Sequence, residues 1–278
     1  MPVTWENTSN IIGDLHPKVQ DCTAVGPVVL WAGRGSNELL PVMSPPAPVI
    51  RYSLVIPAYN EEKRILGLIE SITQFEGELI FVCDGSDHTA DVVENIAKSH
   101  PGLTIQCLRF TTRLGKGGGV IAGLAAAHAP LIGYVDADGS TGIDEMCRLF
   151  GYLSSSDAVI GSRWVPGSQL EIRQNWLRRL ESRGFNLIIR LLFGLSFHDT
   201  QCGAKVFKKS AVDAVLPHLI ARGFEFDVEL LWKLSRAGYR IEEVPIAWQN
   251  KGDSRVRKGD MIRMIVGLLK VRLHPGTQ

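Results

Sequence analysis

Two aspartates separated by one residue, Asp136 and Asp138, follow a short apolar run and precede Gly139. If residues 131–135 form a buried strand, both carboxylates stand at its carboxyl end, where open α/β sheets bind ligands. Two hard oxygen ligands held close together suit Mg²⁺ or Mn²⁺, which keep several waters and bridge to substrate phosphates. The pair alone also fits a surface turn rich in Asp and Gly. The elements around it must decide between a metal–diphosphate site and a turn.

The composition is that of an ordinary globular protein. The 278 residues are 45% hydrophobic and 21% charged, which is enough for one large α/β core. A net charge of +1 gives no reason to expect a nucleic-acid partner, so any anion site must be local. The five cysteines are dispersed without a C-x-x-C spacing, which favours reduced thiols in a cytosolic compartment. We expect neither a membrane-spanning helix nor a signal peptide.

Three regions differ in pattern along the chain. Residues 1–49 show no sustained period and end in a Pro-rich stretch, which predicts a flexible N-terminal extension. Residues 50–257 carry the strand and helix patterns of the main domain. Residues 258–278 include a basic amphipathic helix, expected over residues 260–273, that suits either a membrane surface or packing against the sheet.

Four buried strands are expected in the first half of the chain, at residues 51–57, 78–83, 103–110 and 131–135. We expect a helix after the first strand, with Asn60 as its N-cap and with Glu61 and Glu62 in its first turn. Further helices are expected over residues 90–98 and 120–128. Strands that alternate with helices predict an α/β fold with a parallel sheet and right-handed crossovers.

Polar side chains follow each of these strands at its carboxyl end. Because the carboxyl ends of parallel strands meet at one edge of a sheet, we expect these side chains to share one crevice. This convergence is more specific than any single motif and favours the metal–diphosphate interpretation. The residues concerned are Tyr59, Glu61, Asp84, Lys116, Asp136 and Asp138.

A run of glycines, residues 115–119 with Lys116 inside it, does not match a known phosphate loop. A Walker A motif requires Ser or Thr after its lysine, and here glycines follow. No G-x-G-x-x-G pattern follows the first strand either. We therefore expect the glycines to permit a close backbone approach, and Lys116 to act as a point charge near a phosphate or a base.

A long helix is expected to begin near Trp176. Arg178 and Ser182 lie four residues apart and share one face of it, which suits an anion or, alternatively, an exposed arginine-rich face. Residues 185–193 are apolar nearly all round and fit either a buried core or a lipid-facing surface. Residues 241–248 are expected to form a last strand, and Pro245 indicates that this strand lies at an edge.

These residues, in this order and spacing, resemble the family 2 glycosyltransferases with the GT-A fold, on residues 55–61, 84–89, 115–117 and 136–138. The second half is similar to the polyprenyl-phosphate (dolichyl-phosphate) glycosyltransferases, on residues 160–163, 178–185, 199–205 and 224–230. The segment at residues 199–205 is closer to the dolichyl-phosphate glucosyltransferases than to the mannosyltransferases. The resemblance covers about residues 52–257.

The resemblance implies a donor-nucleotide site. Pro57, Tyr59 and Glu61 would line the nucleotide pocket. Asp84 would contact the nucleobase, with Lys116 nearby. UDP-glucose is the favoured donor, and GDP-mannose is the other candidate.

The resemblance also implies a metal site and an acceptor site. Asp136 and Asp138 would hold Mg²⁺ or Mn²⁺ on the donor diphosphate. Arg163, Arg178 and Ser182 would meet the phosphate of a polyprenyl or dolichyl phosphate.

Two departures from the lipid mannosyltransferases concern the donor phosphates. Ser140 stands where those enzymes carry Gln, and Gln249 stands where they carry Arg before a late G-x-S-[KR] motif, here residues 252–255. Lys251 or Arg255 would have to supply the missing charge.

The reaction implied is transfer of a hexose, glucose in preference to mannose, with inversion, by an enzyme on the cytoplasmic face of a membrane. A phosphate acceptor is already anionic and needs no strong base, so Asp227 is expected to orient the sugar or the metal. Two alternatives are a soluble family 2 transferase with a hydroxyl acceptor, for which Asp227 would be the base, and a non-catalytic nucleotide-sugar-binding domain.

Overall fold

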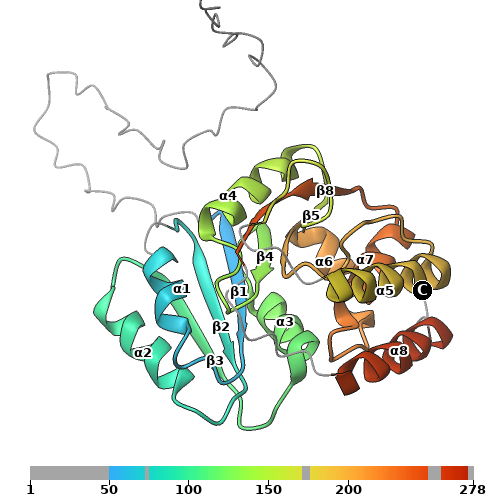
Figure 1. Ribbon diagram of the computed structural model, residues 1–278. Coiled ribbons are helices and arrows are strands. Elements are labelled where there is room, and N and C mark those ends of the chain that lie inside the picture. Colours follow the sequence, from blue (N-terminus) through green and yellow to red (C-terminus); the bar gives the residue numbers. More distant parts are fainter. Residues whose placement is uncertain (1–49, 73–74, 171–175, 250–257, 275–278) are drawn as a thin grey trace, which may run out of the picture. The chain divides into compact units, whose positions relative to one another are not determined.

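The computed structural model describes residues 50–72, 75–170, 176–249 and 258–274. The N-terminal extension expected over residues 1–49 lies outside this part of the chain. A seven-stranded sheet forms the centre of the fold (Figure 1). Its strands, in spatial order, are β3 (Thr104–Arg109), β2 (Glu78–Cys83), β1 (Tyr52–Ala58), β4 (Leu131–Val135), β7 (Ala204–Lys208), β5 (Ala158–Ser162) and β8 (Ile241–Pro245).

The sheet is mostly parallel, as the sequence predicts for its first half. The expected strands are present as β1 to β4, and the β1–β2, β2–β3 and β1–β4 pairs are parallel. Strand β7 is the exception, because it runs antiparallel to both β4 and β5. Lys205 and Lys208 break its apolar pattern, so the sequence gives only a weak strand signal there.

Helices cover both faces of the sheet (Figure 1). Side chains of β1 alternate between the two resulting cores, with Leu54 and Ile56 in one and Val55 in the other, as expected for a strand buried on both faces. One face packs against α1 (Ile65–Ile72), α2 (Thr89–Ser99) and α4 (Ile143–Gly151). The other packs against α3 (Gly115–Ala126), α6 (Lys209–Val215), α7 (Phe226–Arg236), α5 (Trp176–Phe193) and α8 (Lys258–Leu273).

Two expected boundaries are wrong. Helix α1 begins at Ile65, so Asn60 is not its N-cap and no acidic residue lies in its first turn. The segment at residues 241–248 is two strands: β8 at the edge of the large sheet, and β9 (Ala247–Trp248), which pairs with β6 (Gln169–Leu170) in a second sheet. The expected edge position of this segment is confirmed, since among the described strands β8 is the last of the large sheet and pairs with β5 alone.

The glycine run belongs to a helix and not to a loop, which corrects the expected start of α3 at residue 120. The glycines let α3 lie close to its neighbours, because side chains there would collide with them. A Cβ at Gly123 would come within 2.2 Å of Val55 Cγ1, and a Cβ at Gly117 within 2.5 Å of Phe226 Cβ. The glycines therefore permit a close approach, as expected, and it is between α3 and the neighbouring elements that carry Val55 and Phe226.

Two further expectations concern the chain as a whole. Within the described residues, Cys83, Cys107, Cys147 and Cys202 form no disulfide, and Cys22 lies outside them. Among the helices in the described part of the chain, none has the length and apolar character needed to cross a membrane.

The packing of α3 predicts opposite effects for two Gly-to-Ala changes. Gly123→Ala should destabilise the protein by about 1–3 kcal/mol or more, because the new methyl group overlaps Val55. Gly67→Ala on α1 is the matched control, since nothing lies within 4 Å of its Cβ position, and it should stabilise by up to about 1 kcal/mol. Urea unfolding of both variants measures the difference, and equal effects would contradict this packing.

Candidate functional site

The two motif aspartates lie directly after β4, at the carboxyl end of the parallel strands. The Asp136 N–H donates to the Gly203 carbonyl at 3.2 Å. A Cβ at Gly203 would lie 1.9 Å from Asp136 Oδ2, so only glycine fits beside this carboxylate. Asp138 Oδ1 accepts the N–H of Ser140 at 2.9 Å, and Gly139 between them has a φ of +68°. Both carboxylates remain partly exposed.

Lys116, in the first turn of α3, connects Asp136 to a buried carboxylate. Its Nζ lies 2.9 Å from Asp136 Oδ1 and 3.6 Å from Asp227 Oδ2. Burial alone would lower the pKa of Lys116, but the charges of Asp136 and Asp227 outweigh it and raise that pKa. Lys116 is therefore a fixed cation between two carboxylates.

Asp227, at the start of α7, is held by buried groups from two strands. Its side chain is 1% exposed, and Oδ1 lies 2.5 Å from Lys205 Nζ and also accepts a hydrogen bond from Tyr134 Oη. Burial tends to raise the pKa of Asp227, but the charges of Lys205 and Lys116 overcome it and lower that pKa. The carboxylate is thus an ionised counter-charge for two lysines, and both of its oxygens are engaged.

Asp84, after β2, orients the helix that carries Lys116. Its Oδ2 accepts hydrogen bonds from the backbone N–H groups of Leu114 at 2.8 Å and Gly115 at 3.2 Å. Pro57, at the end of β1, packs beneath the same helix, since a Cβ at Gly119 would lie 3.4 Å from Pro57 Cβ. The ends of β1, β2 and β4 and the start of α3 therefore meet, as the convergence of polar residues predicts.

The loop after β1 is fastened to the loop after β2. Asn60 adopts a left-handed conformation with a φ of +53°, and its Oδ1 accepts the N–H of Ser86 at 2.9 Å. The Glu61 N–H donates to Thr89 Oγ1 at 2.8 Å. The physical role of Asn60 is therefore to join two loops.

The side chains of Tyr59 and Glu61 each face a cation. The Arg113 guanidinium lies 4.1 Å from the centre of the Tyr59 ring. The Glu61 carboxylate binds Arg64 through two bonds of 2.7 and 2.9 Å and is nearly fully buried. The Glu61 carboxylate is thus engaged by Arg64, the residue directly before α1.

Arg163, directly after β5, is fixed by a buried acid. Its Nε and Nη2 donate to Asp199 at 2.7 and 2.9 Å, and its backbone N–H donates to the same carboxylate at 3.0 Å. Burial would lower the pKa of Arg163, but the charge of Asp199 outweighs it, and Asp136 adds to the rise. The side chains of Arg178 and Ser182 in α5, and residues 250–257 with Lys251 and Arg255, lie outside the described part.

Sequence reasoning assigned no role to three residues that hold this site together, namely Tyr134, Asp199 and Lys205. Lys205 is 0% exposed and also donates to the Cys202 carbonyl at 2.5 Å. Lys205 lies inside the short apolar strand β7. Because a buried charge requires a partner, its position in the sequence could have indicated a buried acidic side chain nearby.

The residues at this edge fit a divalent cation shared with a substrate. In the described part of the chain, no group of three or more His, Cys, Asp and Glu side chains is arranged to hold a metal. Asp136 and Asp138 supply hard oxygen donors at a partly exposed edge, which is the ligand set that Mg²⁺ or Mn²⁺ takes when phosphates and water complete its coordination. The donor chemistry therefore fits, provided that the substrate contributes ligands.

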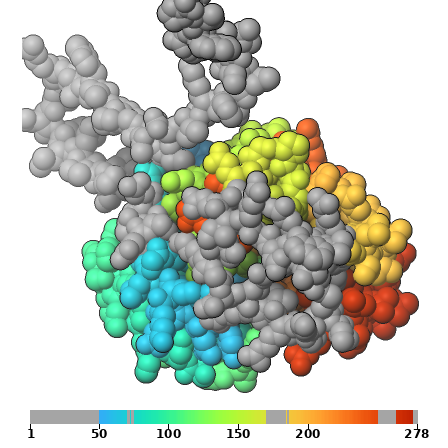
Figure 2. Space-filling model, viewed as in Figure 1, coloured from blue at the N-terminus to red at the C-terminus, as the bar shows by residue number. Residues whose placement is uncertain are grey.

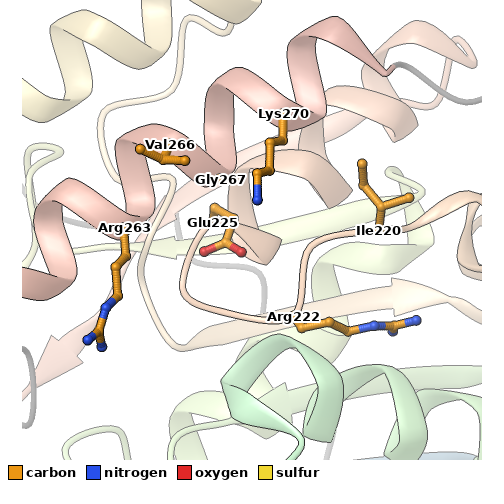
Figure 3. Close-up of a pocket in the computed structure, with 7 residues that line it drawn as sticks. All are labelled: Ile220, Arg222, Glu225, Arg263, Val266, Gly267 and Lys270. Carbon is orange, nitrogen blue, oxygen red and sulfur yellow. The ribbon is translucent and has the colours of Figure 1, made fainter.

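Two hollows of the described surface are lined by residues outside the carboxylate cluster. One, of about 220 Å³, is lined by the loop after β2 and the end of β3, including Ser86, Asp87 and Arg109. The other, of about 440 Å³, is formed by α8 and the segment before α7 (Figure 3). None of the predicted site residues lines it, although Glu225 belongs to the family-like segment at residues 224–230.

The buried ion pair predicts a strongly non-additive pair of variants. Lys205→Met should cost about 3–5 kcal/mol of unfolding free energy, because it leaves the Asp227 charge buried with one partner fewer. The double variant Lys205→Met/Asp227→Asn should lose at least about 1 kcal/mol less than the sum of the two single losses. Denaturant unfolding of the four proteins measures this coupling, and additive losses would show that the pair is not energetically linked.

Comparison with known proteins agrees with this geometry. The family model described as glycosyl transferase family 2 matches residues 53–216. A dolichyl-phosphate beta-glucosyltransferase of Trichomonas vaginalis is 32% identical over 240 residues, which are 80% of this chain and 71% of that protein. An undecaprenyl-phosphate mannosyltransferase of Micrococcus luteus is 30% identical over 234 residues, which are 80% of this chain and 93% of that one.

Solved structures show the same fold at lower identity. A mannosyltransferase of Pyrobaculum calidifontis in complex with GDP-Man and Mn²⁺ superposes with a TM-score of 0.59 at 19% identity, over 84% of this chain and 66% of that one. Glucosyl-3-phosphoglycerate synthase of Mycobacterium tuberculosis, with Mn²⁺ and UDP, gives 0.59 at 21% identity over 80% of each chain. On the fold, the order of the motifs and the family match, the chain belongs to glycosyl transferase family 2 and has the GT-A fold.

Proposed function

We propose that this protein transfers a hexose, with inversion, from a nucleoside-diphosphate sugar to a polyprenyl or dolichyl phosphate. The observation that carries the proposal is the similarity, over about four-fifths of the chain, to enzymes named for transfer to dolichyl and undecaprenyl phosphate. Glucose is favoured over mannose, and UDP-glucose over GDP-mannose, because a yeast dolichyl-phosphate beta-glucosyltransferase also matches, at 30% identity over 247 residues.

The donor side of the reaction is assigned to the edge formed by β1, β2 and β4. Pro57, Tyr59 and Glu61 lie on the β1 side, and Asp84 lies on the β2 side. Asp136 and Asp138 would hold Mg²⁺ or Mn²⁺, which neutralises charge that develops on the leaving diphosphate. Lys116 already lies 2.9 Å from Asp136, so its cation stands where the same diphosphate would bind.

The acceptor phosphate is assigned to Arg163, Arg178 and Ser182. Asp199 holds the Arg163 guanidinium through two hydrogen bonds, which fixes it before substrate arrives. Arginine and hydroxyl donors suit a phosphate, whose oxygen is already anionic and attacks the anomeric carbon without prior deprotonation. The enzyme would meet this lipid as a peripheral protein on the cytoplasmic face of a membrane.

The environment of Asp227 favours a phosphate acceptor over a hydroxyl acceptor. A hydroxyl group needs a general base within hydrogen-bond reach. Asp227 was the candidate base, but it is buried and bound by Tyr134, Lys205 and Lys116. Its proposed role is to position Lys116.

The proposal predicts metal-dependent sugar transfer into the organic phase. Purified protein with Mn²⁺ or Mg²⁺, labelled UDP- and GDP-sugars and a short polyprenyl phosphate should label the lipid from one donor, and UDP-glucose is expected to be that donor. Asp136→Asn should reduce the rate at least about 100-fold, since it weakens the metal site. A near-normal rate in this variant would refute the metal role. Donor hydrolysis without lipid labelling would favour the hydroxyl acceptor, and binding without turnover would favour a non-catalytic domain.

A further inference from the structure

Exposed apolar side chains are concentrated in one part of the molecule. Eight large hydrophobic side chains of the described residues are exposed, and all but Leu66 belong to α5, α8 or Ile220. Leu191 of α5 and Leu273 of α8 are the most exposed, at 78% and 75%. Helices α5 and α8 lie side by side (Figure 1), and Arg272 Nε of α8 donates to the Leu192 carbonyl of α5 at 3.0 Å. Atoms of α8 form the molecular surface at the lower right of Figure 2.

Both helices use their other faces to pack against the core. Ile189 and Phe193 of α5, and Met264, Leu268 and Val271 of α8, are buried. The sequence left open whether these segments meet the core or a lipid surface. In the structure each helix has one face in the core and one apolar face exposed.

The 440 Å³ hollow lies within this exposed surface and carries excess positive charge. It is lined by Ile220, Arg222 and Glu225 before α7, and by Arg263, Val266, Gly267 and Lys270 of α8. Three cationic side chains and one carboxylate therefore belong to its lining. Figure 3 shows Lys270 reaching from α8 toward Glu225, while Arg222 and Arg263 extend to opposite sides.

In the described part of the chain, the carboxylate of Glu225 forms no ion pair with Arg222 or Lys270. Its Oε1 accepts the Gly223 N–H at 3.1 Å, and Gly267 lets it lie against α8, because a Cβ there would come within 2.8 Å of it. Within the part of the chain that the structure describes, neither Arg222 nor Lys270 has an ion pair. Among the described residues, therefore, no acidic side chain pairs with either cation, which leaves both able to meet an external anion.

The segment that forms this hollow also touches the functional site. The Gly118 N–H, in the first turns of α3, donates to the Arg222 carbonyl at 3.1 Å. Lys116 Nζ lies 6.0 Å from the centre of the Phe224 ring. A ligand in the hollow is therefore separated from Lys116 by only one loop.

We propose that this hollow binds the headgroup phosphate of an anionic phospholipid, and that the apolar side chains around it enter the membrane surface. Cations that flank exposed aliphatic side chains are the signature of an interfacial surface, where each basic residue contributes attraction to anionic lipid. A free phosphate ion would use the cations and gain nothing from Val266, Leu191 or Leu273. This inference rests on the proposed function, because the role of the surface would be to hold the enzyme at the membrane that contains its acceptor.

Vesicle binding of charge-reversal variants tests the proposal. The full-length protein is mixed with phosphatidylcholine vesicles, with or without phosphatidylglycerol, and the bound fraction is measured by sedimentation without sugar donor or polyprenyl phosphate. Lys270→Glu should weaken binding to the anionic vesicles about fivefold or more, and Arg222→Glu/Lys270→Glu should weaken it further. Lys98→Glu is the matched control, because Lys98 is an exposed helical lysine on α2, on the other side of the sheet, and it should change binding by less than about twofold.

Equal binding of the wild type and the Lys270→Glu variant, or an equal loss in Lys98→Glu, would overturn the proposal. So would a change from dimer to monomer in Arg222→Glu/Lys270→Glu without a change in vesicle binding, which would identify the surface as a contact between copies of the chain. Transfer to a short polyprenyl phosphate in detergent separates this proposal from the proposed function. Lys270→Glu should transfer at the wild-type rate in detergent, whereas a wild-type protein that transfers nothing would refute the transferase assignment alone.

Discussion

The ion pair between Asp227 and Lys205 connects the elements that build the site. It joins the start of α7 to the start of β7 in a buried position, and Tyr134 of β4 and Lys116 of α3 bind the same carboxylate. A buried charge without a partner is strongly unfavourable, so each of these groups requires the others. Four elements that are distant in sequence are thereby held at fixed positions around one oxygen pair.

This arrangement determines what Asp136 meets. Lys116 stands between the buried Asp227 and the half-exposed Asp136. Its ammonium group therefore links the buried ion pair to the carboxylate at the edge of the sheet. Gly203, at the start of the β7 segment, approaches Asp136 so closely that no side chain fits there. The carboxylate is thus confined by backbone on one side and by a cation on the other. Such confinement is what a site needs to keep its geometry before substrate binds.

The first half of the fold could be predicted from the sequence because its signals are local. Apolar runs define β1, β2 and β4, and polar residues after each run identify the sheet edge where Asp84, Lys116 and Asp136 meet. The start of α3 could not be predicted, because glycine disfavours helices and the packing of Gly117 against Phe226, which calls for a glycine there, is visible only in the structure. The N-cap role expected for Asn60 failed for a similar reason, since its partner is a loop 26 residues away.

The antiparallel strand β7 and the role of Lys205 depend on contacts that no local pattern reveals. The strand is short and contains two lysines, and its position between β4 and β5 follows from pairing with both. The role of Asp199 could not be predicted either, because it fixes Arg163, which is distant in sequence, after β5. Sequence motifs identified the segment at residues 199–205, but only the structure shows which side chains it contributes to the site.

The measurement that tests this account most directly is the affinity of Mn²⁺ for variants at Lys116, followed by electron paramagnetic resonance without any nucleotide. Lys116→Met should bind Mn²⁺ about fivefold more tightly than the wild type, because it removes a cation 2.9 Å from Asp136 that is worth about 1 kcal/mol of repulsion. Lys116→Arg keeps the charge and should bind like the wild type. Unchanged or weaker binding in Lys116→Met would contradict the claim that Lys116 and the metal share Asp136.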